Sequence, residues 1–130
     1  MKKHKRPDLY ELNLTADDKK ALHLSIRHWE KDVVKMFKDG WKIRLKDNIW
    51  EKDKQIKTLL IGEKNCALCN LYIADCRGCP LSEATGRLCS MLRSPYRKFI
   101  HFPTLKNAEA MVDTLETILA QNYEGKRIEE

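Results

Sequence analysis

Residues 15–40 read TADDKKALHLSIRHWEKDVVKMFKDG, and they set the architecture expected for the chain. Thr15 offers a hydroxyl that accepts a backbone N–H, and two acids follow it, where the positive end of a helix favours them. Apolar residues then recur three or four positions apart, as on one buried helix face: Leu22, Ile26, Trp29, Val33 and Phe37. Gly40 is a good stop, because glycine enters the left-handed conformation at little cost. The pattern predicts one long amphipathic helix.

A second amphipathic helix is expected near the C-terminus. Pro103 and Thr104 start it, and its apolar face has helical spacing: Leu105, Ala108, Met111, Val112, Leu115, Ile118 and Leu119. This helix should close the core against the first one. The predicted fold class is therefore mainly α, a small single domain with a minor β strand or hairpin.

The segment after Gly40 carries a shorter pattern. Residues 41–46 alternate apolar and basic side chains, which is the period of a half-buried strand, and a turn follows at Asp47-Asn48. Residues 49–61 carry a weaker stripe at helical spacing, formed by Trp50, Asp53, Ile56 and Leu60. That stripe predicts a further helix ended by Gly62.

Later in the chain, Ser94-Pro95 is expected to interrupt any helix, and residues 96–102 to form a turn and a short extended segment. A length of 130 residues fits a single domain. The expected organisation is a basic N-terminal arm, a helical domain that includes the cysteine segment 66–89, and a polar tail, over residues 1–14, 15–121 and 122–130.

Five cysteines form the most specific motif, at Cys66, Cys69, Cys76, Cys79 and Cys89. A two-residue gap lets both sulfurs of one turn reach the same ion, and two such pairs complete a tetrahedral thiolate site. Gly78 allows the second turn to bend sharply, and Pro80 fixes the chain as it leaves. The spacing predicts a metal clasp, with zinc as the expected ion.

Two alternatives to four-thiolate zinc remain open. The Cys79-Pro80 step also occurs in iron–sulfur ferredoxins, so a cluster fits the same ligands, and the thiols could also be free or redox-active. Five thiols exceed the four positions of one tetrahedral ion. Either Cys89 is spare or it replaces one member of the second pair.

The cysteine segment carries a resemblance. The motifs are CALCNLY, CRGCPL, TGRLC and SPY, and within residues 66–96 they resemble a five-cysteine pattern of small uncharacterised proteins of bacteriophages and mobile elements. The resemblance implies that all five cysteines form one site. It also implies a phage or mobile-element accessory protein, and it brings no activity with it.

The charge pattern suggests a contact surface. The chain has 25 Lys and Arg against 19 Asp and Glu, a net charge of +6 that permits an acidic partner such as nucleic acid. No acid lies between Glu83 and Glu109, where cations alternate with aromatic residues. Cations hold phosphates, and aromatic faces stack on unpaired bases. The predicted contact residues are Arg93, Tyr96, Arg97 and Lys98.

A plainer interpretation of the same segment is that its aromatic residues, Phe99 and Phe102 among them, belong to the core and that the cations are their solvated neighbours. His23, His28 and His101 form no recognisable catalytic grouping with a cysteine or serine, and no phosphate loop or His-Glu-x-x-His motif is present. The sequence therefore favours a binding protein over an enzyme.

The sequence shows neither a signal peptide nor a membrane-spanning segment, and this bears on the expected cellular location. The basic start meets Pro7 and Asp8 rather than an apolar stretch, and no apolar run approaches the roughly 20 residues that span a bilayer. We expect a cytoplasmic protein that contacts nucleic acid or a nucleic-acid-handling machine. The rival expectations are a protein-interaction inhibitor or adaptor with a purely structural zinc, and an iron–sulfur redox or sensor protein.

Overall fold

The computed structural model describes residues 9–10, 13–61, 68, 71, 79–86 and 94–129, with the backbone alone for residues 121–129. In chain order its elements are α1 (Ala16–Trp29), a π-helical turn η1 (Glu30–Val34), α2 (Lys35–Lys38), β1 (Lys42–Arg44), a 3-10 turn η2 (Leu45–Asp47), β2 (Ile49–Lys52), β3 (Gln55–Thr58), α4 (Pro80–Thr85), α5 (Pro95–His101) and α6 (Leu105–Glu129). The predicted class is confirmed: the protein is mainly α with a small antiparallel sheet.

The first helix begins and ends where the sequence predicts. Thr15 and Asp18 form a capping box, in which each backbone N–H donates to the other side chain at 3.0 Å. At the far end the N–H of Gly40 donates to the carbonyl of Phe37, and that of Trp41 to the carbonyl of Met36, both at 3.0 Å. This pair of bonds is a Schellman motif, and it requires the positive φ of 97° that Gly40 adopts.

One turn of this helix is wider than predicted. The apolar residues from Leu22 to Phe37 are spaced four, three, four and four apart, which exceeds the 3.6 residues of an α-helical turn on average. A regular helix would therefore rotate the later ones away from the core. The π-helical turn η1 takes up the excess, and Val33 and Val34 are both buried as a result.

The predicted helix over residues 49–61 is wrong. Residues 49–58 form the hairpin of β2 and β3, in which Trp50 pairs with Lys57 and Lys52 with Gln55. The Asp53-Lys54 turn has positive φ at both residues, as tight hairpins require, and this breaks a helix. The predicted strand is present as β1, which pairs with β2 on its other side, so the sheet order is β1-β2-β3.

The predicted turn and extended segment over residues 96–102 is also wrong, because α5 occupies most of it. The hydroxyl of Ser94 accepts the N–H of Arg97 at 3.1 Å and caps the helix. Pro95 lies in the first turn, where its missing N–H leaves no bond unmade. The Ser-Pro step starts a helix instead of ending one.

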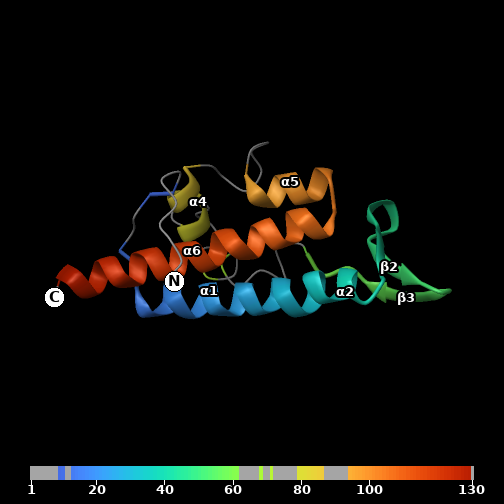
Figure 1. Cartoon of the computed structure of the whole chain (residues 1–130), viewed down its shortest axis with the longest axis horizontal. Coiled ribbons are helices and arrows are strands. Elements are labelled where there is room, and N and C mark those ends of the chain that lie inside the picture. The colour runs from blue at the N-terminus through green and yellow to red at the C-terminus, as the bar shows by residue number, and fades with distance from the viewer. Residues whose placement is uncertain are drawn as a thin grey trace.

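The core lies on both sides of α6, which runs between α1 on one side and α4 and α5 on the other (Figure 1). Thr104 caps α6 by accepting the N–H of Asn107, and the helix continues to Glu129, past its expected end near Gln121. The seven apolar residues predicted for α6 are all buried or partly buried in this core. Leu9 and Leu14 are buried too, so the folded domain reaches into the segment expected to be an arm.

The hairpin turn gives a first testable expectation. Lys54 sits at a φ of 72°, which costs a residue with a Cβ about 1–2 kcal/mol and glycine almost nothing. Lys54→Gly should raise the free energy of unfolding by about 0.5–1 kcal/mol in urea denaturation, since the entropy lost by glycine offsets part of the gain. Gln55→Gly, one residue on and inside β3, should lower it. A loss of stability in both variants would contradict the assigned turn.

Candidate functional site: a cationic corner and a cysteine segment

Of the five predicted metal ligands, Cys79 belongs to the part of the chain that the structure describes, and Cys66, Cys69, Cys76 and Cys89 lie outside it. Cys79 is buried, and its carbonyl accepts the N–H of Glu83 at the start of α4. Within the described residues no three His, Cys, Asp or Glu side chains gather as a metal site would require. The metal clasp therefore stays a prediction.

The described residues do show how the cysteine segment is tied to the core. Leu68, between the first two cysteines in sequence, is buried, and so are Pro80, Leu81 and Ala84 directly after Cys79. The carbonyl of Ala84 also accepts the N–H of Tyr10 at 2.7 Å. Thiolates are the ligands that zinc prefers. Leu68 and the start of α4 would anchor the segment that carries these thiolates to the core.

The predicted contact residues fall into three groups. Arg93 lies outside the described residues. Tyr96 is half-buried: its hydroxyl donates to the carbonyl of Ile61 at 2.9 Å, and its ring stands edge-on to Trp29 with centroids 6.4 Å apart. Arg97 and Lys98 lie on the outer part of α5, where Lys98 is exposed and the Nε of Arg97 donates to Nε2 of His101 at 3.0 Å.

The structure separates the aromatic residues of this segment. Phe99 is fully buried and edge-on to Trp29, at 5.1 Å between centroids, whereas Phe102 is 68% exposed. Phe102 therefore joins the candidate surface, and the structure ties Tyr96 to the fold instead. The sequence does hold a signal for this: positions 96, 99 and 100 share one helix face, but the signal is readable only once the segment is known to be helical.

We refer to Arg97, Lys98, His101, Phe102 and Lys106 as the α5–α6 corner. Its backbone is held by Asn107, whose amide donates to the carbonyl of Phe102 at 2.9 Å and more weakly to that of Lys98 at 3.4 Å. The N–H of Thr104 donates to the carbonyl of Phe102 as well, at 2.8 Å. A surface fixed in this way loses little conformational freedom when a ligand binds.

Three comparisons with known proteins were negative. No protein-family model, curated protein or solved structure matches this chain. Among the helices of the described residues, none has the length and apolar character that crossing a membrane would take. The candidate function therefore rests on the side chains themselves.

The net charge of the chain is concentrated in two segments. Residues 41–58 carry six Lys and Arg against three Asp and Glu, and residues 95–108 carry three Lys and Arg and no acid. Together they account for the whole +6, so the rest of the chain is formally neutral. Figure 1 shows the sheet and the turn from α5 into α6 toward the end of the molecule opposite the C-terminus.

Aromatic packing joins these two segments. Phe37 of α2 stands edge-on to Trp50 of β2, with centroids 4.9 Å apart, and to Phe99 of α5, at 6.2 Å. Such contacts stabilise by about 0.5–1.5 kcal/mol each beyond the area they bury. The sheet and α5 are thus held against the same ring.

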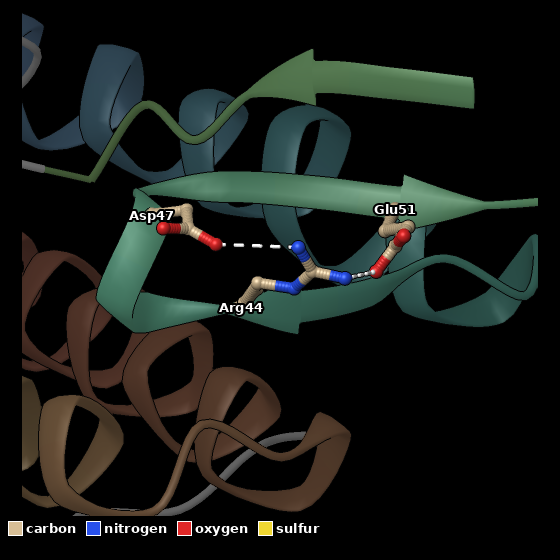
Figure 2. A network of polar contacts seen from close by, with 3 residues as sticks. All are labelled: Arg44, Asp47 and Glu51. Carbon is tan, nitrogen blue, oxygen red and sulfur yellow. Dashed lines mark hydrogen bonds and ion pairs between the residues drawn. The ribbon is translucent and has the colours of Figure 1, made fainter. Parts of the chain in front are cut away.

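Within the sheet, Arg44 neutralises two of the three acids (Figure 2). Its guanidinium donates to Asp47 at 3.2 Å across the η2 turn and to Glu51 at 2.5 Å on β2. The hydrogen bond to Asp47 and the charge of Glu51 raise the pKa of Arg44 above its usual value. The lysines of the sheet are consequently left with few opposing charges.

Proposed function

We propose that this protein is a small metal-stabilised nucleic-acid-binding protein and that its α5–α6 corner binds single strands. The observation that carries the proposal is the exposure of Phe102, which is 68% accessible and lies four residues from Lys98 on one side and from Lys106 on the other. Base stacking on an aromatic face, combined with cations that hold the phosphates, is how proteins bind unpaired strands.

Each corner residue has a distinct role in this proposal. The face of Phe102 stacks on one base, while Lys98 and Lys106 hold the phosphates on either side of it. Arg97 is held by His101 and supplies a third cation. Tyr96 positions α5 through its hydrogen bond to Ile61 and takes no part in stacking.

Zinc on the cysteine segment is the structural part of the proposal. Thiolate donors fit Zn²⁺ or an iron–sulfur cluster. We prefer zinc because a tetrahedral set of thiolates is its usual structural site. The ion would close the cysteine segment onto the core at Leu68 and Cys79, both of which are buried. Metal analysis of the purified protein distinguishes the two, and a cluster would also absorb near 400 nm, at about the energy of thiolate–iron charge transfer.

The resemblance of the cysteine segment supports the biological setting that we propose, an accessory factor of a bacteriophage or mobile element. A chain of this kind would contact nucleic acid directly or as part of a nucleic-acid-handling machine. The genomic neighbourhood of the coding sequence tests whether the protein belongs to such an element.

Phe102→Ala tests the stacking role. Loss of one stacked base should weaken binding to single strands by about 5- to 150-fold, corresponding to about 1–3 kcal/mol, and leave duplex binding unchanged. Fluorescence anisotropy with single- and double-stranded DNA and RNA at two salt concentrations measures both. Leu24→Ala is the matched control, because Leu24 is another exposed apolar residue, on α1. Equal affinity of wild type and Phe102→Ala for single strands would remove Phe102 from the site.

A protein partner is the second candidate, and the edge strand β3 favours it. All four residues of β3 are exposed, and Ile56 is 62% accessible. An exposed strand edge with an apolar side chain can add a strand from another protein. If the wild type binds none of the four nucleic acids at low salt, this candidate replaces nucleic-acid binding.

A further inference from the structure

The sheet presents cations that the α5–α6 corner does not use. Lys42 on β1, Lys46 in η2 and Lys54 in the β2–β3 turn are all exposed. None of the three forms an ion pair with any residue that the structure describes, whereas Arg44 engages both Asp47 and Glu51. Lys52 donates instead to the carbonyl of Asp39 at 2.6 Å, and the Nζ of Lys57 lies 4.9 Å from the centroid of the Trp41 ring.

The register of the sheet places Lys42 on the face that is turned away from the core. Trp50 is buried and packs on Phe37, so the face of the sheet that carries Trp50 points toward the helices. Side chains alternate along a strand, and Lys42 pairs with Glu51, the neighbour of Trp50. Lys42, Arg44 and Glu51 therefore share the opposite, outer face.

We infer that the sheet is a second phosphate-binding surface of the same site, and that a single strand bound at the α5–α6 corner continues onto Lys42 and Lys46. The inference rests on the proposed function and extends it to a ligand longer than the corner alone can hold. Three observations support it: both surfaces are cationic, both lie toward the end of the molecule opposite the C-terminus, and Phe37 packs against the elements that carry them, through Trp50 and Phe99.

The sheet contributes charge and no stacking, which fixes the kind of contact it makes. The aromatic side chains in and next to the sheet pack in the core: Trp41 and Trp50 are buried, and Phe37 is partly buried. The lysines can therefore contact only the phosphate backbone of the nucleic acid, so this contact does not depend on base sequence. Each phosphate that a lysine holds adds about 0.7 to the log–log dependence of affinity on salt for a single strand.

The test compares a short and a long strand. Lys42→Ala/Lys46→Ala should leave binding to an oligonucleotide of about 6 residues unchanged, since the corner alone covers it. For an oligonucleotide of about 20 residues, we expect the salt slope to fall by about 1.4 and the affinity to fall several-fold at low salt, for DNA and RNA alike. Lys20→Ala/Lys31→Ala is the matched control, because it removes two exposed lysines from α1 and η1.

A variant that raises the positive charge of the sheet should tighten binding, which a loss of folding stability would not do. Asp47→Asn/Glu51→Gln removes both carboxylates that Arg44 engages, and it should tighten binding of the long strand and raise its salt slope. The inference is overturned if long-strand affinity responds to the α1 control as strongly as to the sheet variants, or to neither. In that case a loss of binding in Phe102→Ala would still uphold the corner, whereas failure of the proposed function would show as no response in Phe102→Ala and Lys98→Ala/Lys106→Ala.

Discussion

If the cysteine segment binds the proposed zinc, removing the ion with a strong chelator should unfold much of this protein. In small zinc domains the free energy of metal binding is folding free energy, on the order of 10 kcal/mol, which is comparable to the whole stability of a domain of this size. The buried residues Leu68 and Cys79 would lose the closure that holds them in the core. Circular dichroism melting, recorded with and without chelator, measures the effect. An unchanged melting curve after verified metal removal rejects the structural metal.

The same experiment can be made specific to single ligands. Substituting each cysteine by serine should separate four variants that lose metal and stability from one whose cost is mild, under about 2 kcal/mol. Cys66 and Cys69 are expected among the four, because their two-residue spacing suits one ion. Full metal occupancy and stability in either variant would mean that the site is assigned to the wrong residues.

Phe99→Ala should be among the most damaging substitutions within the described core. The side chain is fully buried between Trp29 and Phe37, and removing such a ring costs about 3–5 kcal/mol, from lost burial and from the cavity left behind. Urea denaturation measures the free energy of unfolding. Phe102→Ala is the control, since the same change at a 68% exposed residue should stay within about 0.5 kcal/mol. Similar costs for the two variants would contradict the placement of α5.

The sequence predicts the long helices but not the hairpin, and the difference has a physical reason. The long helices were predictable because their signals are local: Thr15 and Gly40 bound α1, and Thr104 starts α6. The hairpin at Asp53-Lys54 was missed because neither residue is glycine, so nothing in the sequence announces two positive φ angles. The stripe through Ile56 and Leu60 imitates a helix face, although both side chains are exposed.

The sequence predicts the cationic residues of the candidate site but not its exposed aromatic residue. Arg97 and Lys98 stand out because no acid lies near them in sequence. Whether Tyr96 or Phe102 faces solvent depends on the phase of α5, and a proline can precede a helix as well as end one. The Ser94 cap shows that this proline begins a helix, and the bond from the Arg97 N–H to the Ser94 hydroxyl is visible only in the folded chain.

The π-helical turn η1 has a consequence for the whole cationic end. An extra residue in a regular α-helix would rotate everything after it by about 100° about the helix axis, whereas a π-helical turn absorbs the residue locally and keeps the helix beyond it in phase. The sheet follows this helix directly, whereas α5 reaches the same region from the other side of α6. Without η1 the same sequence would therefore carry Lys42 and Lys46 about 100° around the helix axis relative to α5. A one-residue deletion in η1 should leave a regular helix and keep this orientation, whereas a further residue that the helix does not absorb would change it.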